Sequence, residues 1–168
     1  MTTYCFATES ATYRAASDIE NKIEDLKNKG GSPQNSELKG FEDFAVECSI
    51  LKVAGSDNGQ NCADHGIQIF GGMGYSCDSP MEMAWRDSRI ARIYEGTNEI
   101  NKMLSIAMLL KKASKGEIDL ITKSSEVLNQ VKKNTNHFQF NQSQESDLGQ
   151  EQHLIKNLKN VFLILINL

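Results

Sequence analysis

The chain has 168 residues with a formal net charge of −4, and 39% of its residues are apolar. This size and composition suit one folded domain, or one domain with an appendage. A nucleic-acid-binding domain needs a basic face, and a membrane-spanning helix needs about 20 consecutive apolar residues; the sequence offers neither. We therefore expect no nucleic-acid partner and no membrane span.

The four cysteines show neither metal-ligand nor redox spacing, so we expect no metal site. Cys5, Cys48 and Cys62 fall within helical patterns, which predicts small core residues of a reduced, intracellular protein. Cys77 lies in a predicted turn and is expected to be the most exposed of the set. The N-terminus lacks the basic start and apolar core of a secretory signal, which also favours an intracellular location.

Two long helices are predicted in the N-terminal part of the chain. Residues 2–28 carry apolar side chains at steps of three and four, and the Gly-Gly-Ser-Pro sequence at 30–33 would end that helix. Residues 36–70 repeat the pattern, and the short polar loop between the two makes an antiparallel pair. Within the second helix, Ser56–Asn61 is rich in turn-forming residues. Because mid-helix glycine costs about 1 kcal/mol relative to alanine, we expect a helix that continues there but is locally weak.

A glycine-rich turn separates the second helix from the next one. The apolar end of the second helix runs into Gly71–Gly74, and a non-helical turn through Asp78 is predicted to follow. Ser79–Glu82 has the pattern of a capping box with proline at the first helical position. A helix should therefore start there and end near Tyr94.

Glycine and threonine in Glu95–Thr97 interrupt the helical pattern again, and a further helix is predicted over 98–112. Glu95 would then lie at the tip of a short acidic corner between two helices. Farther along, 118–131 predicts another helix, and 134–150, rich in Asn, Gln and Ser, predicts a flexible linker. We interpret residues 1–113 as a helical bundle and residues 114–150 as a short helix with a flexible linker. Residues 151–168 are interpreted as the start of a further amphipathic helical region.

Three separated motifs occur in order along the chain: Gln68–Tyr75, Arg86–Asp87 and Ile93–Ile100. Together they closely resemble the flavin-contacting and catalytic region near the C-terminus of the acyl-CoA dehydrogenases. The resemblance covers about residues 6–116, and Ile155–Lys159 is similar to the opening of the extra C-terminal region in the larger, very-long-chain-like and bacterial members. It implies an all-α bundle, incomplete because its first helix is missing from this sequence, with a tethered C-terminal helix.

The resemblance implies that the chain is the C-terminal part of an enzyme that dehydrogenates the α,β bond of a fatty acyl-CoA, with FAD as its cofactor. In the family a carboxylate removes the α-proton while a hydride leaves the β-carbon for the flavin, and Glu95 matches that base. Tyr94 and Gly96 match positions beside the substrate. A carboxylate on a tight turn can reach a bound ligand. The alternative for Glu95 is an acidic residue placed before a helix N-terminus, where the helix dipole favours negative charge.

Four further residues match family positions that contact FAD. Thr97 and Glu99 match residues beside the flavin dinucleotide, and Gln68 and Gly72 match residues that reach the adenosine diphosphate half of a cofactor held by a neighbouring subunit. The alternatives are helix capping by Thr97, dipole complementation by Glu99, and a helix C-cap with a Schellman turn at the glycine.

The family enzyme also has an N-terminal helical domain and a middle β domain, which supply most of the flavin pocket and are not in this sequence. We therefore expect either a part of an acyl-CoA dehydrogenase or, alternatively, a non-catalytic helical module that keeps only the oligomerising faces of the bundle. The resemblance further implies a homo-oligomer, electron-transfer flavoprotein as the electron acceptor, and a location in the bacterial cytoplasm or, alternatively, the mitochondrial matrix.

Overall fold

The computed structural model describes residues 1–133 and 148–166. Within these residues every regular element is a helix and no strand is present, which confirms the all-α prediction. The chain divides into two compact units, Met1–Leu109 and Leu110–Leu168. The three-part division of the sequence stays a prediction, and most of its linker, residues 134–147, lies outside the described residues.

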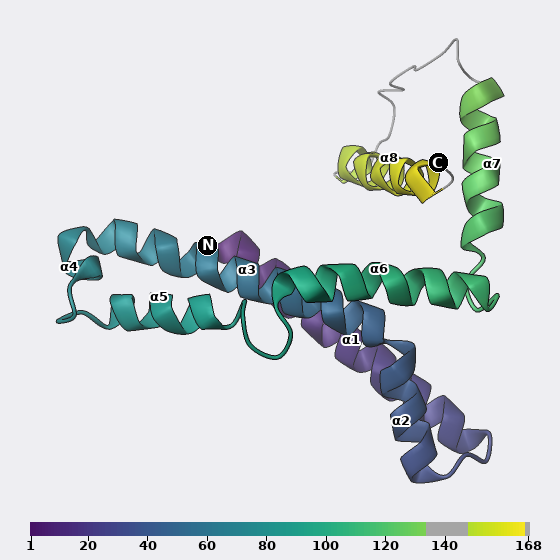
Figure 1. The fold of residues 1–168 in the computed structure, drawn as a ribbon, viewed down its shortest axis with the longest axis horizontal. Helices are drawn as coiled ribbons and strands as arrows, with labels where there is room; N and C mark the ends of the chain where they lie inside the picture. The colour runs from purple at the N-terminus through teal and green to yellow at the C-terminus, as the bar shows by residue number, and fades with distance from the viewer. Residues whose placement is uncertain (134–147, 167–168) are drawn as a thin grey trace. The chain divides into compact units, whose positions relative to one another are not determined.

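The first helix, α1 (Thr2–Asn28), has the predicted bounds, whereas the second predicted helix is divided. It begins earlier than expected, as α2 (Pro33–Asp43), because Ser32 caps it and Pro33 takes the first helical position. At Phe44 the backbone leaves helical geometry (φ −105°, ψ 15°), and α3 (Ala45–Phe70) follows. Both α2 and α3 pack on α1 (Figure 1).

The turn-forming segment Ser56–Asn61 is helical throughout, so the predicted continuation of the helix is confirmed. Its polar side chains have long-range partners that offset their low helix propensity. Asn58 Nδ2 donates to Thr8 Oγ1 on α1 at 2.8 Å, and the side chains before it bind the start of α6, as described below. The local weakness of this segment stays a prediction.

The end of α3 turns sharply and brings α5 back along it. Gly71 has φ +60°, in the left-handed region that glycine adopts without steric cost. A short helix, α4 (Gly72–Tyr75), follows, because the Gly71–Tyr75 backbone keeps local hydrogen bonds such as Gly74 N–H to Gly71 O at 3.0 Å. The non-helical turn predicted to follow Gly74 is found at residues 76–78, and the prediction is wrong at Tyr75, which belongs to α4.

Helix α5 (Pro80–Ile90) starts at the predicted position, where Ser79 Oγ accepts from the Met81 N–H at 3.3 Å. Glu82 does not complete a capping box in the described contacts; its carboxylate accepts from Arg86 Nε at 2.7 Å instead. The helix ends at Ile90, four residues before the predicted end near Tyr94. Figure 1 shows α5 running beside α3, with α4 joining their ends, and α3 and α5 are in extensive contact.

Helix α6 (Asn98–Ser114) begins where predicted, at the close of the acidic corner. In the second unit, α7 (Leu120–Lys133) and α8 (Gly149–Ile166) pack against each other. The predicted helix over 118–131 is thus found with slightly shifted ends, and the predicted linker is wrong at Gly149 and Gln150, which already belong to α8. In the described ranges 1–133 and 148–166, no helix is both long and apolar enough to cross a membrane.

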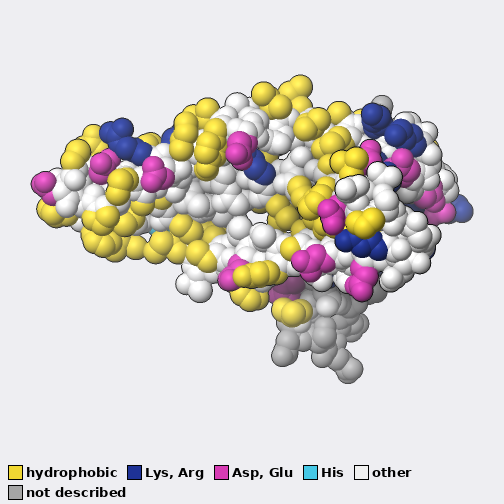
Figure 2. All heavy atoms as spheres, turned by 90° about the horizontal axis from the view of Figure 1, so that it is seen from below, with side chains coloured by type: hydrophobic (Ala, Val, Ile, Leu, Met, Phe, Trp, Pro, Cys, Tyr) yellow, Lys and Arg dark blue, Asp and Glu magenta, His cyan; other side chains and the backbone are white. Residues whose placement is uncertain are grey.

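Few apolar side chains are buried in this fold. Large hydrophobic residues stand exposed on each helix of the first unit, among them Phe6 at 72% and Met103 at 74%. Figure 2 shows hydrophobic side chains gathered on the surface over the end formed by α4 and α5, where Tyr75 is 81% exposed. The helices therefore present apolar faces that the described residues do not cover.

The thin packing also corrects the interpretation of the cysteines as core residues. Cys5, Cys48 and Cys77 are exposed and Cys62 is half-buried, because paired helices leave much of their surface open. Burial, together with the neighbouring Cys5 thiol, raises the pKa of the Cys62 thiol.

Candidate active site

The acidic corner between α5 and α6 is a tight turn built on two left-handed residues. Glu95 has φ +53° and Gly96 has φ +83°. In the described part of the chain, Glu95 is the non-glycine residue with positive φ. This conformation costs a non-glycine residue about 1–3 kcal/mol. A backbone hydrogen bond from the Asn98 N–H to Arg92 O, at 3.1 Å, closes the turn. Glu95 therefore lies at the tip, exposed to solvent, as the sequence predicted.

Thr97 ends the corner as the cap of α6, because its Oγ1 accepts from the Ile100 N–H at 3.1 Å. This is the capping role given above as the alternative for Thr97. The hydroxyl hydrogen of Thr97 remains available to donate to a ligand. Tyr94, 53% exposed, and Glu99 flank the turn with their side chains open to solvent.

Beneath the corner lies a buried polar network centred on Asn98, whose side chain is fully buried (0% exposed). Asn98 Nδ2 donates to Ser56 Oγ at 2.9 Å and to Asp57 Oδ1 at 3.0 Å. Its Oδ1 accepts from Lys52 Nζ at 2.9 Å. Arg92 Nε lies 2.7 Å from the same Asp57 oxygen as an ion pair, although its N–H does not meet hydrogen-bond geometry. The corner is thus tied to the middle of α3.

The carbonyl of Gly96 is held from two sides. Lys52 Nζ donates to Gly96 O at 2.7 Å, and Asn101 Nδ2 donates to the same oxygen at 2.9 Å. Two donors occupy both lone pairs of a carbonyl oxygen, which fixes the plane of the peptide group. A Cβ on Gly96 would lie 3.0 Å from Asn101 Nδ2, so glycine at this position also leaves room for that contact.

Next to the corner, a hollow of about 500 Å³ lies between α3 and α5 and is open to solvent. Tyr94 and Glu95 line it at the corner, and the small residues Gly55 and Gly59 line it on α3. The hollow is large enough for part of a small-molecule ligand. The other residues that line it are Lys52, Ser56, Asp87, Ser88 and Ala91.

The predicted site residues form two separate groups in this chain. Tyr94, Glu95, Gly96, Thr97 and Glu99 are together at the corner, as their proximity in sequence requires. By contrast, Gln68 and Gly72 lie at the far end of α3 and the start of α4, at the left of Figure 1.

The separation of these groups follows from helix geometry. Gln68 comes sixteen residues after Lys52, which contacts the corner, and a rise of 1.5 Å per residue places it about 24 Å away along α3. The backbone at this end is open to approach, because a Cβ on Gly71 or Gly72 would meet nothing within 4 Å. The two groups are therefore too far apart to contact the same part of one ligand.

Sequence reasoning missed the residues that hold the corner: Lys52, Ser56, Asp57 and Asn98. A signal was present, since Lys52 and Ser56 are four residues apart and share a face of α3 that is otherwise built from small residues. In the part of the chain that the structure describes, no group of three or more His, Cys, Asp and Glu side chains could hold a metal ion.

Comparison with known proteins identifies the family of this chain. The family model for the acyl-CoA dehydrogenase C-terminal domain matches residues 1–110. A probable acyl-CoA dehydrogenase of Bacillus subtilis (strain 168) is 33% identical over 163 residues, which is 97% of this chain and 27% of that protein. The mitochondrial very long-chain specific acyl-CoA dehydrogenase of Rattus norvegicus is 45% identical over 65 residues, covering 39% of this chain and 10% of that protein.

A solved structure is also similar. The crystal structure of an acyl-CoA dehydrogenase from Bacillus anthracis, complexed with FAD, superposes with a TM-score of 0.86 at 31% identity, over 96% of this chain and 27% of that chain. The present chain therefore spans about a quarter of the length of these two Bacillus relatives.

The helical pairing and the glycine-bounded acidic corner define a C-terminal helical domain of the acyl-CoA dehydrogenase type. The chain belongs to the acyl-CoA dehydrogenase family, whose members include short-chain and very long-chain specific oxidoreductases.

Proposed function

We propose that this chain is the C-terminal part of an FAD-dependent acyl-CoA dehydrogenase, with Glu95 as the base that removes the α-proton of a fatty acyl-CoA. The observation that carries the proposal is the conformation of Glu95. A non-glycine residue held at φ +53° on an exposed tip, beside a hollow that it lines, is a strained position typical of functional sites.

The proposed chemistry balances as a 1,2-dehydrogenation. Glu95 takes the proton from the α-carbon, the two electrons of that C–H bond become the new carbon–carbon double bond, and hydride departs from the β-carbon. FAD, when bound, supplies the acceptor for that hydride. Tyr94 and Gly96 would contact the acyl thioester beside the base, since they flank Glu95 in the turn.

The residues present fit a flavin dinucleotide, in two places. At the corner, Thr97 can donate its hydroxyl hydrogen to the cofactor. Glu99 would accept from a hydroxyl or N–H group, because its charge would repel a diphosphate. At the far end of α3, the exposed amide of Gln68 and the open backbone of Gly72 suit the adenosine diphosphate half. Because these places are about 24 Å apart along α3, the second set would serve a cofactor held by another subunit.

This arrangement supports a homo-oligomer in which each FAD contacts two subunits. The exposed apolar side chains of the first unit, such as Ile69 at 69% and Phe70 at 56%, lie beside Gln68 and suit such a contact. Electron-transfer flavoprotein as the acceptor for the reduced flavin, and a bacterial cytoplasmic location, remain part of the proposal.

The same exposed faces favour a second candidate, a non-catalytic helical module that only assembles with partners. The two candidates differ in activity. In a hybrid enzyme, this chain would replace the matching segment of the Bacillus subtilis relative, and flavin bleaching on addition of acyl-CoA would be followed anaerobically.

The enzyme proposal expects the hybrid to bind FAD and bleach, and Glu95→Gln to lower the bleaching rate by about 10²- to 10⁴-fold with little change in bound flavin. The matched control is Glu20→Gln, which removes an equal charge from an exposed position of α1 and leaves the base in place. A Glu95→Gln hybrid that bleaches as fast as the parent would overturn the proposal. The isolated chain should neither retain flavin nor reduce it, because it supplies only contacts at the edge of the cofactor.

A further inference from the structure

Lysine side chains in the first unit mostly pair with carboxylates on the surface. Lys22, Lys27, Lys29 and Lys39 each have an Asp or Glu oxygen within 3.3 Å. Lys52 differs in both its partners and its burial. It is half-buried on α3, and its described hydrogen bonds go to a backbone carbonyl and to a buried side-chain amide.

Both acceptors of Lys52 belong to the corner that carries Glu95. The carbonyl of Gly96, 2.7 Å from Nζ, belongs to the residue directly after Glu95. Asn98 Oδ1, 2.9 Å from Nζ, belongs to the buried first residue of α6. A single ammonium group therefore contacts the residue directly after Glu95 and the first residue of α6, and links both to α3.

The left-handed conformation of Glu95 requires such an anchor. A residue at φ +53° relaxes toward negative φ unless its surroundings prevent the adjoining peptide groups from rotating. Asn101 Nδ2 also donates to Gly96 O, but Asn101 is on α6, next to the corner itself. Lys52 supplies the contact from a separate helix, 44 residues away in sequence. Asn98 is also bound to Ser56 and Asp57 on α3, so what Lys52 adds from α3 is the contact with the Gly96 carbonyl next to Glu95.

We propose that Lys52 is the positioning residue for Glu95: its ammonium group fixes the Gly96 peptide plane and thereby aims the Glu95 carboxylate at the hollow between α3 and α5. The inference rests on the proposed function for the identity of the base. Lys52 acts through the backbone and Asn98, so it is not itself a catalytic residue.

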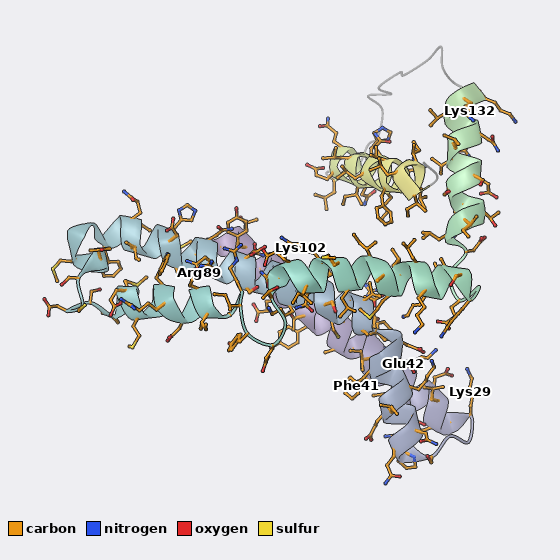
Figure 3. All side chains as sticks on the ribbon, viewed as in Figure 1. Lys29, Phe41, Glu42, Arg89, Lys102 and Lys132 are labelled. Carbon is orange, nitrogen blue, oxygen red and sulfur yellow. The ribbon has the colours of Figure 1, made fainter. Side chains whose placement is uncertain are left out.

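The first arm of the test uses the 168-residue chain and needs no activity. Lys52→Met removes the donors at similar length, Lys52→Arg keeps donors and charge, and Lys102→Met removes an equal charge from the second turn of α6 (Figure 3). Amide hydrogen exchange by NMR is read at Asn98, whose N–H is bonded to Arg92 O across the turn.

The expected result is exchange at Asn98 at least about 10-fold faster in Lys52→Met, with Lys52→Arg and Lys102→Met near the parent. Amides in the middle of α1 serve as the internal reference for global stability. Unchanged exchange at Asn98 in Lys52→Met overturns the proposal. If Lys52→Met does not fold, Lys52→Gln, which retains a shorter donor, replaces it. Exchange at Asn98 should then also be faster than in the parent, by a smaller factor.

The second arm uses the hybrid enzyme. A misplaced catalytic group costs about 10²-fold in rate, so Lys52→Met should lower kcat by about 10- to 100-fold while KM and flavin content stay within about twofold. Lys52→Arg should recover most of kcat, which a general loss of stability would not permit. Equal losses in kcat and flavin content, without recovery by arginine, overturn the positioning role.

The two arms separate this inference from the function on which it rests. If Glu95→Gln leaves the hybrid fully active, the proposed function fails, and the exchange measurement alone then decides whether Lys52 holds the corner. If Glu95→Gln is inactive but Lys52→Met has the parent kcat, the proposed function stands and the positioning role is wrong.

Discussion

Asn98 on α6 and Asp57 on α3 are joined by a hydrogen bond of 3.0 Å, although 41 residues separate them in sequence. The Asn98 side chain is completely buried, and the Asp57 carboxylate also lies 2.7 Å from Arg92. This contact joins α3 to α6, the helix that follows the corner. The polar middle of α3 is therefore a binding surface for the corner.

Replacing Asn98 should destabilise the chain. Asn98→Ala leaves Ser56 and Asp57 without their buried partner, and an unsatisfied buried group costs about 1–3 kcal/mol. Urea unfolding followed by circular dichroism measures the difference. Asn61→Ala, at an exposed position of α3, is the control and should change the free energy of unfolding by less than about 0.5 kcal/mol. Equal effects from the two variants would contradict the assigned role of Asn98.

Two glycines of α3 should respond to alanine to different extents. Gly59 is helical and exposed, and a Cβ there would meet nothing within 4 Å, so Gly59→Ala should stabilise by about 0.4–1 kcal/mol. A Cβ on buried Gly66 would overlap the Met81 methyl group, so the end of the Met81 side chain must shift and Gly66→Ala should stabilise less than Gly59→Ala. Thermal unfolding of both variants checks the pair. A destabilised Gly59→Ala would indicate that the hollow beside it closes in solution.

The stability should depend on pH through Asp43. Burial alone would raise the pKa of Asp43, but hydrogen bonds and charge from Lys39 and Lys22 outweigh it, so the pKa lies below its ordinary value of 3.8. A carboxyl group with a lowered folded pKa adds stability above its unfolded pKa and loses it as the pH falls through the folded value. The Asp43 contribution should thus be complete at pH 7 and disappear below about pH 3.8.

The variant that tests this is Asp43→Asn. Surface ion pairs contribute about 0.2–1 kcal/mol, so Asp43→Asn should be less stable than the parent by about that amount at pH 7, and the two curves should converge as the pH falls below 3.8. Glu20→Gln, at an exposed position of α1, is the control for lost surface charge. A difference that persists unchanged at low pH would assign the effect to packing.

The segment from Asp57 to Asn61 should exchange its amide hydrogens faster than α3 on either side. Glycine, asparagine and aspartate lower helix propensity there, by about 1 kcal/mol for the glycine. Hydrogen exchange resolved along α3 provides the measurement. Uniform protection across the helix would mean that the contacts with Thr8 and Asn98 fully compensate the poor propensity.

The sequence alone determined the helical elements, the glycine turn and the position of Glu95 at the tip of the corner. These features follow from local physics: apolar periodicity, capping by Ser79 and Thr97, and the backbone freedom of glycine. The break at Phe44 and the early end of α5 escaped prediction because helix boundaries depend on packing as well as propensity.

Only the tertiary structure decided what the polar residues of α3 do. The apolar periodicity of α3 is interrupted by Lys52, Ser56 and Asp57. Their partner Asn98 lies 41 to 46 residues away in sequence. Periodicity describes the face on which a side chain lies but contains no information about which distant residue will meet it. The fold brings α3 and the start of α6 together, and this contact holds Glu95 in a conformation that its own backbone disfavours.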